Sequence, residues 1–153
     1  MQKKINIQNK KARFEFEILD KYIAGIQLTG TEIKSIRNSQ ARITESFCEF
    51  NERGELFIIN MYIQEYLFGH HFNHNPKSER RLLLNKRELR SLKKDVEAKG
   101  NTIVPLRLFI NERGFAKLEI ALAKGKQTHD KRNVIKDRDN KRDLARIKKS
   151  FNA

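Results

Sequence analysis

The sequence has almost no cysteine and no long apolar run, and these absences exclude several classes of protein. Cys48 is the only cysteine among 153 residues, so no intrachain disulfide can form and a reducing compartment is expected. No stretch approaches the roughly 18 apolar residues of a transmembrane helix. The basic amino terminus is not followed by the apolar segment of an export signal. We therefore expect a cytoplasmic protein.

Acidic residues are too few to balance the basic ones. Lysine and arginine number 33 against 19 aspartates and glutamates, which gives a net charge of +14. Such a charge attracts polyanions, because lysine and arginine release counterions from phosphates when they neutralise them. An anionic membrane would require a basic helix with a strongly apolar face, and no stretch has that pattern. The predicted partner is therefore nucleic acid, with no membrane.

Short segments of alternating polarity predict a body rich in β-strands. The predicted strands form three pairs: 14–18 with 22–28, 47–50 with 56–63, and 106–110 with 115–121. Asp20-Lys21 predicts a tight reversal within the first pair. The tetrapeptide Asn-Glu-Arg-Gly joins both other pairs, at 51–54 and 111–114, which predicts two hairpins of similar geometry. Pro105 lacks an N–H, so its strand should begin there or lie at an edge.

Two helices are predicted between the strands. Thr31 can cap a short helix in which Ile33 and Ile36 face inward, while Lys34 and Arg37 lie on the outer side.

The second helix, over residues 86–98, has the stronger signals. Asn85 and Glu88 have the spacing of a capping box, and Gly100 stands where a C-terminal cap belongs. The apolar run Leu82-Leu83-Leu84 before it is predicted to be core.

Glu32 and Asn85 each have two interpretations. Glu32 can stabilise the positive end of the short helix or accept hydrogen bonds from a base edge. Asn85 can cap the long helix or read a base through its amide, and one residue could do both.

This order of elements predicts a mainly β fold. A small barrel of about six strands with two or three inserted helices, of the oligonucleotide-binding (OB) type, is the nearest common architecture, and an α+β sandwich is the alternative. We place an RNA-binding barrel in residues 1–123 and a basic junction and tail in residues 124–153.

Three histidines lie in the stretch 66–81, which is rich in Asn, Gly and Pro and is predicted to be a long loop. No carboxylate or thiol stands at ligand spacing, so we predict no metal site and no cofactor. The histidines could instead stack on bases, and basic residues nearby could bind phosphate. These residues are His70, His71, His74, Lys77, Arg80 and Arg81. A nuclease would need such histidines and Glu79 as acid and base, but no nucleophile motif or paired acidic site supports an enzyme.

Residues 1–13 contain five cations and no acid. They are interpreted either as a flexible terminus or as a basic arm that contacts phosphate.

The tail from 124 to 153 holds eleven lysines and arginines against four aspartates, and residues 136–143 contain no apolar side chain. It cannot bury a face against the barrel, so we expect it to be disordered when free and to fold against a polyanion. A solubilising tail without a target is the alternative.

Four motifs resemble the SsrA-binding protein family of bacteria (small protein B), the partner of transfer-messenger RNA (tmRNA). They occur in the family's order at 9–13, 30–37, 82–89 and 123–132, the last continuing into 135–138. Gln127 stands where the family often has lysine, and the aromatic residue often found near Asn140 is missing, which bears on how firmly the tail docks.

The resemblance implies a barrel that grips the tRNA-like part of tmRNA and delivers it to stalled ribosomes for trans-translation. The tail would occupy the empty decoding site and messenger channel, against small-subunit ribosomal RNA, with His129 suited to stacking on a base. The chain would act as a monomer. With the basic residues of the arm and the short helix included, the predicted tmRNA face comprises Lys10, Lys11, Arg13, Glu32, Lys34, Arg37, Leu83, Asn85, Lys117, Lys124, Gly125 and Lys126. The predicted ribosome-contacting residues are His129, Asp130, Lys131, Arg132, Ile135, Lys136, Arg138, Arg142 and Arg146.

Overall fold

The computed structural model describes residues 4–98 and 100–125. Its elements, in chain order, are β1 (Asn6–Gln8), α1 (Lys10–Glu15), β2 (Phe16–Ile26), α2 (Gly30–Arg37), β3 (Ala41–Arg42), β4 (Phe47–Phe50), β5 (Leu56–Ile59), β6 (Tyr62–Ile63), the 3₁₀ helix η1 (His70–Phe72), β7 (Arg80–Leu83), α3 (Lys86–Val96), β8 (Asn101–Ile110) and β9 (Ala116–Gly125).

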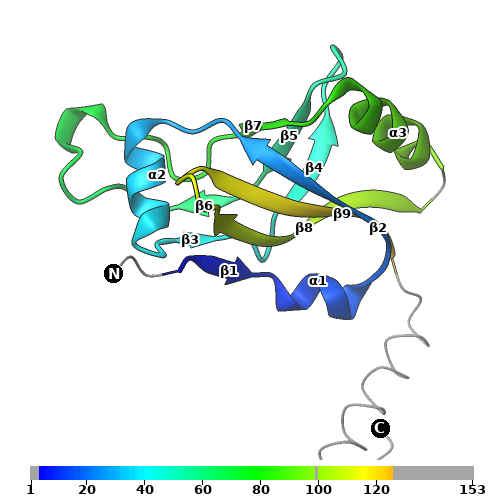
Figure 1. The fold of residues 1–153 in the computed structure, drawn as a ribbon, viewed down its shortest axis with the longest axis horizontal. Helices are drawn as coiled ribbons and strands as arrows, with labels where there is room; N and C mark the ends of the chain where they lie inside the picture. The colour runs from blue at the N-terminus through cyan, green and yellow to red at the C-terminus, as the bar shows by residue number, and fades with distance from the viewer. Residues whose placement is uncertain (1–3, 99, 126–153) are drawn as a thin grey trace, which may run out of the picture.

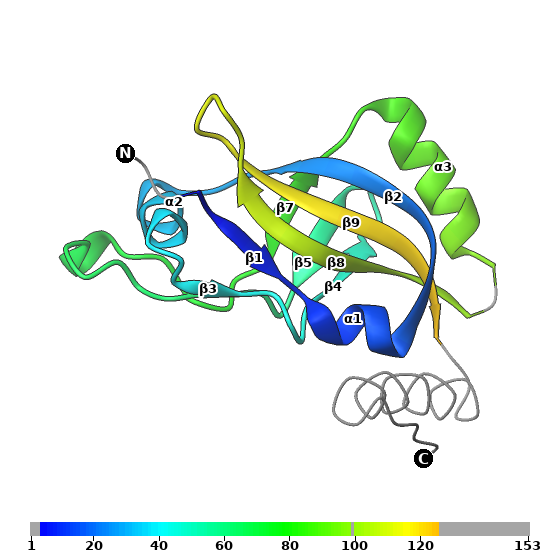
Figure 2. The same cartoon turned by 60° about the horizontal axis from the view of Figure 1, so that its bottom comes forward.

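Six strands close into a ring. Their order is β8, β4, β5, β7, β2 and β9, and β9 pairs back with β8. β1 pairs with β8 outside the ring, and Figure 2 shows β1, β8, β9 and β2 lying side by side. β3 and β6 form a separate two-stranded sheet. The predicted mainly β barrel of about six strands is confirmed, with three α-helices around it.

The main core fills the inside of this ring. α2 and α3 lie at opposite ends of the barrel (Figure 1). Each inserts a fully buried side chain into the core, Ile36 from α2 and Leu92 from α3. Both helices carry their cations on the side away from the core, so the barrel ends are covered by charged surface.

The predicted reversal at Asp20-Lys21 is wrong, because β2 runs without interruption from Phe16 to Ile26. The register between β2 and β9 shifts between Ile18 and Asp20, which makes Leu19 a β-bulge. One extra residue reverses the face to which later side chains point. Ile18 therefore packs under α1 in a second, smaller core, whereas Tyr22 packs against the main core.

The amino-terminal segment forms β1 and α1, so the interpretation of residues 1–13 as a flexible terminus is wrong for the part that the structure describes. β1 pairs with Arg107–Phe109 of β8. Asn9, which is buried, accepts a hydrogen bond from the backbone N–H of Ala12 at 3.2 Å and so caps α1. Its amide also donates to the carbonyl of Pro105 at 2.9 Å. α1 was not predicted from the sequence.

Several element boundaries also differ from expectation. Thr29, not Thr31, caps α2, and it forms a complete capping box with Glu32. The predicted strand 56–63 is broken at Asn60, where φ is +67°. Pro105 lies inside β8 at a register shift and not at its start. At such an irregularity the missing N–H costs no ladder hydrogen bond.

The apolar run Leu82-Leu83-Leu84 is only partly core. Leu82 is 2% exposed, whereas Leu83 is 47% exposed, because successive residues of β7 point to opposite faces. The outward position of Leu83 matters for the site described below.

Two local predictions are confirmed. Gly54 and Gly114 both have positive φ, at 79° and 86°, in the two Asn-Glu-Arg-Gly turns. In each turn the asparagine side chain, Asn51 or Asn111, accepts hydrogen bonds from two following backbone N–H groups. The predicted capping box of the long helix is present, with Asn85 as the N-cap of α3.

Candidate nucleic-acid interface

The outer face of the barrel carries a row of residues from four adjacent strands. In the sheet register Leu83 of β7 lies opposite Gly25 of β2, Gly25 opposite Lys117 of β9, and Lys117 opposite Phe109 of β8. A Cβ added at Gly25 would lie 3.4 Å from Leu83 Cβ and 3.7 Å from Lys117 Nζ. Because Gly25 has no side chain, the surface is recessed between the exposed Leu83 and the Lys117 ammonium.

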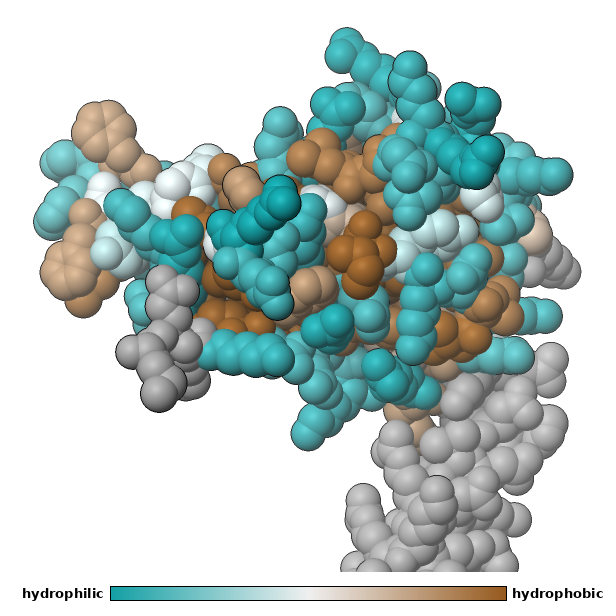
Figure 3. Space-filling view, viewed as in Figure 1, coloured by the Kyte–Doolittle hydropathy of each residue, from teal (hydrophilic) through white to brown (hydrophobic). Residues whose placement is uncertain are grey.

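A second row lies beside the first. Ile23, 47% exposed, is opposite Glu119 of β9, which is opposite Arg107 of β8. The Arg107 guanidinium lies 4.1 Å from the centroid of the Phe109 ring and 3.5 Å from a carboxylate oxygen of Glu119. The two rows, from Leu83 to Phe109 and from Ile23 to Arg107, are called the outer face below. Figure 3 shows apolar surface among polar side chains over β2 and β9.

Lys117 and Asn85 are the polar groups of this region that remain available. Lys117 makes no ion pair with any residue in the described ranges. Asn85, two residues after Leu83, is exposed, and its Oδ1 accepts from the Glu88 N–H at 2.8 Å. Within residues 4–98 and 100–125 its Nδ2 has no hydrogen-bond partner. The cap uses the oxygen of the amide and leaves the N–H groups free to read a base.

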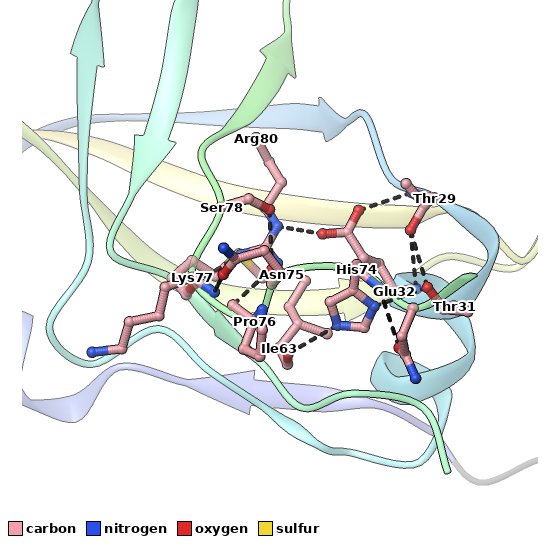
Figure 4. Close-up of polar contacts among 12 residues, drawn as sticks. Thr29, Thr31, Glu32, Ile63, His74, Asn75, Pro76, Lys77, Ser78 and Arg80 are labelled. Carbon is pink, nitrogen blue, oxygen red and sulfur yellow. Dashed lines mark hydrogen bonds and ion pairs between the residues drawn. The ribbon is translucent and has the colours of Figure 1, made fainter. Parts of the chain in front are cut away.

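Glu32 does not lie on the outer face but is a buried residue of α2. It is 3% exposed, and both carboxylate oxygens are used: one accepts from the Thr29 N–H at 2.9 Å and the other from Nε of Arg80 (Figure 4). The interpretation of Glu32 as a group that contacts a base edge is therefore not supported by this geometry. Removing one partner of such a buried pair would leave an uncompensated charge inside the protein, which is strongly destabilising.

Arg80 is the centre of this buried network. It is 3% exposed and donates to the carbonyls of Met61 at 2.7 Å and of Asn75 and Pro76 at 3.1 Å, as well as to Glu32. Its predicted role in a phosphate-binding patch is wrong, because none of its donors faces solvent. Arg81 next to it is exposed but lies 2.9 Å from Glu55.

The three histidines do not converge. His70 and His71 are exposed on η1, whereas His74 is buried. Nε2 of His74 lies 2.9 Å from the Ile63 carbonyl and Nδ1 lies 2.9 Å from the Thr31 hydroxyl. A carbonyl can only accept, so Nε2 donates, and in the neutral ring Nδ1 accepts from Thr31. Over residues 4–98 and 100–125, no group of three His, Cys, Asp or Glu side chains could hold a metal ion.

The cations of α2 lie on the flanks of the barrel end. Lys34 Nζ is 5.4 Å from the centroid of the Tyr66 ring. Arg37 approaches the turn at Gly114 and lines an open hollow with Lys4 and Ile110. The two residues are exposed, but they point to different neighbours.

The described residues of the predicted arm and junction lie at the other end of β9. Gly125 pairs with Phe16, which directly follows α1, so Lys10 and Arg13 of α1 share this end with Lys124. Lys10 and Arg13 are exposed and make no ion pair with a described residue.

Lys11 differs from the other cations of α1. Its ammonium lies 2.7 Å from Glu45 and 3.8 Å from Glu15. The hydrogen bond to the Glu45 carboxylate raises the pKa of Lys11 above its ordinary value. This lysine already has two acidic partners to give up before it can bind a phosphate.

Comparison with known proteins identifies the family. The model of the family described as SmpB protein matches residues 6–150 of the chain. The chain belongs to the SmpB family. The SsrA-binding protein of Flavobacterium psychrophilum is 69% identical, over 99% of this chain and 100% of the relative. That of Brucella anthropi is 54% identical, over 95% of this chain and 91% of the relative.

A solved structure of an SmpB protein has the same fold. It is described as "tmRNA-SmpB: a journey to the center of the bacterial ribosome", is 45% identical, and covers 86% of this chain and 94% of its own, with a TM-score of 0.68. The family resemblance of the four sequence motifs is thereby confirmed.

The predicted SmpB site residues thus fall into separate places. Leu83 and Lys117 lie on the outer face, Asn85 follows Leu83 by two residues, and Lys124 and Gly125 lie at the far end of β9. Lys126 and the predicted ribosome-contacting residues from His129 to Arg146 lie outside the described residues. β9 continues through Gly125, two residues beyond the predicted end of the barrel body.

Sequence reasoning missed Gly25, Ile23 and the Arg107–Phe109 pair. Each of these residues stands at an outward position of a strand. The alternation pattern therefore contained a signal for Ile23, Arg107 and Phe109. Gly25 had a different signal: an isolated glycine within a strand often marks a close approach by another group.

None of the helices in the described ranges is both long and apolar enough to cross a membrane.

Proposed function

We infer that this chain binds tmRNA and acts in trans-translation on the ribosome. The observation that carries the inference is the match of the SmpB family model to nearly the whole chain, together with SsrA-binding relatives that align from end to end. The structure adds a surface suited to that task. Its outer face combines exposed apolar side chains with the Lys117 ammonium, and the Asn85 amide follows Leu83 by two residues. Among the described residues, Lys117 has no ion pair and Nδ2 of Asn85 has no hydrogen-bond partner.

We propose that this outer face contacts the tRNA-like part of tmRNA. Selective RNA recognition uses apolar and aromatic surfaces for unstacked bases and amide groups for their edges, with lysine and arginine positioning the phosphates. Leu83 and Ile23 supply apolar surface for bases, and Asn85 supplies an amide for a base edge. Lys117 and Arg107 supply the cations that position phosphates. Glu32 contributes through Arg80, as a positioning residue.

We propose a separate role for the residues that follow Gly125. Their charge, with eleven cations against four acids from 124 to 153, suits a ribosomal RNA surface such as the decoding site and messenger channel. Lys10, Arg13 and Lys124 would contact RNA at the point where this segment leaves the barrel. Removal of residues 133–153 should leave tmRNA affinity intact and abolish tagging on stalled ribosomes. Loss of both together would contradict this division of labour.

We further propose that the chain performs no chemistry of its own and works as a monomer in the cytoplasm. Sedimentation of the pure protein, alone and with the RNA fragment, tests the monomer. Incubation with end-labelled tmRNA tests whether the chain cleaves RNA. We expect the RNA to remain intact.

The decisive experiment measures binding of the pure protein to the tRNA-like fragment of tmRNA, with excess ordinary tRNA as competitor, at several salt concentrations. We expect binding that survives the competitor. Lys117→Ala should weaken it and reduce the salt slope by about one. Lys93→Ala, an exposed lysine of α3 with the same charge change, is the matched control and should have a smaller effect. Equal loss to any tRNA would reduce the function to general RNA binding.

A further inference from the structure

The loop between β6 and β7 presents a cluster of large apolar side chains to solvent. Leu67, Phe68 and Phe72 are 80%, 67% and 89% exposed. Figures 1 and 2 both show this loop projecting beyond α2, at the end of the molecule opposite α3. In Figure 3 apolar side chains stand at its tip. Single exposed apolar residues are common, but a cluster of them on a projection marks an interaction site.

Side-chain hydrogen bonds close the loop on itself and join its base to the barrel. Asn73 accepts from the Tyr66 N–H at 2.9 Å and donates to the Tyr66 carbonyl at 2.7 Å, which closes the tip. Gly69 lies so close to Asn73 that an added Cβ would be 2.5 Å from its Nδ2. At its base, His74 and Arg80 tie the loop to α2 and β6, as described above. The apolar side chains are therefore presented by a preorganised support, which lowers the entropy cost of binding.

Cations border the aromatic rings at the base of this loop. The guanidinium carbon of Arg42 lies 4.6 Å from the centroid of the Tyr62 ring. Nζ of Lys34 lies 5.4 Å from the centroid of the Tyr66 ring. The two tyrosines line an open hollow of about 490 Å³ together with Gln64, Glu65, Leu67, His70, Asn73 and Pro76. Among these lining residues Glu65 is the one acid. Aromatic faces for bases with cations for phosphates are the combination that proteins use for unpaired nucleotides.

We propose that the tip of this loop binds an unpaired RNA nucleotide, whose base stacks on Phe68 or Phe72 while Lys34 and Arg42 neutralise phosphates beside it. The proposal rests on the proposed function, because it takes the partner to be RNA, and it adds a contact distinct from the outer face. β9 ends with Gly125 at the end of the barrel next to α1, whereas the loop projects from the end next to α2 (Figure 1). The nucleotide can belong to tmRNA or to ribosomal RNA.

Photocrosslinking identifies the class of partner. Full-length protein with p-benzoylphenylalanine in place of Phe72 is irradiated with the tRNA-like fragment of tmRNA, and separately with stalled ribosomes and tmRNA. We expect a crosslink to RNA in at least one of these two arms, and the arm that gives it identifies the source. Crosslinks to protein alone, or none in either arm, would overturn the proposal.

Affinity measurements test whether the stacking matters. Phe68→Ala combined with Phe72→Ala should weaken binding in the crosslinking arm roughly 5- to 150-fold, which corresponds to the ~1–3 kcal/mol lost per unstacked base. Phe68→Tyr combined with Phe72→Tyr keeps the rings and should retain affinity. Leu19→Ala, at the 46% exposed bulge of β2, is a control for loss of exposed apolar surface.

The outcomes separate this inference from the proposed function. If the wild-type protein binds neither tmRNA nor ribosomes, the proposed function fails and this inference fails with it. If the wild type binds and the double alanine variant binds equally well in both arms, only the inference about the loop is wrong. Thermal unfolding of every variant should match the wild type, since the substituted side chains are exposed.

Discussion

The outer face and the buried network beside α2 contain similar residue types with opposite roles. Lys117 on the outer face and Asn85 next to it have donors without a partner among the described residues, whereas the nitrogens of the Arg80 guanidinium and both carboxylate oxygens of Glu32 are hydrogen-bonded inside the protein. On a strongly basic protein, both sets look like RNA ligands. The difference teaches that residue type does not identify a contact residue. What identifies it is whether its polar atoms are already satisfied.

The largest expected effect comes from removing the centre of the network. Arg80→Ala leaves Glu32 buried without its charged partner and removes one donor each from the carbonyls of Met61, Asn75 and Pro76, so unfolding free energy should fall by about 3–5 kcal/mol. Arg81→Ala, at the next residue, removes only a half-exposed ion pair with Glu55 and should cost at most about 1 kcal/mol. Urea unfolding followed by circular dichroism compares the two. Similar losses for both variants would contradict the contrast between buried and exposed arginines.

A smaller effect, on binding and not on stability, is expected at the outer face. Gly25→Val would fill the low surface between Leu83 and Lys117, while valine suits a strand. Affinity for the tRNA-like fragment should fall about tenfold or more, equivalent to roughly 1.4 kcal/mol, and Gly25→Ala should give an intermediate value. Melting temperatures of both variants are measured alongside. Unchanged affinity in the valine variant would remove the outer face from the interface.

The smallest effect separates the two roles of Asn85. Serine is a good N-cap without an amide, so Asn85→Ser should change stability by less than about 0.5 kcal/mol, whereas Asn85→Ala should cost about 1 kcal/mol. If the free Nδ2 reads a base, both variants should lose a similar, few-fold share of RNA affinity. Affinity that follows helix stability, with serine equal to wild type, would show that Asn85 acts only as a cap.

Local signals in the sequence were sufficient for the elements that depend on neighbouring residues. The capping box at Asn85 and the two Asn-Glu-Arg-Gly turns appear as predicted, because their hydrogen bonds join residues at most four positions apart. The same capping-box spacing was present at Thr29 and Glu32, and applying it there would have placed the start of α2 correctly. α1 had a weaker signal, since its cap, Asn9, is held by contacts to a distant strand.

The sequence by itself determined the charge, the family, the approximate positions of β4, β5, β8 and β9 and the start of the long helix. It predicted two strands where β2 is a single one, and it did not predict β7 as a strand. Only the tertiary structure decided which side chains face solvent. Arg80 and Glu32 are 48 residues apart, and their pairing is invisible to any local pattern. The bulge at Leu19 likewise sends Ile18 and Tyr22 to opposite faces although their spacing is that of one face. Burial depends on long-range pairing of strands, and that pairing separates the residues left free to bind RNA from those that hold the barrel together.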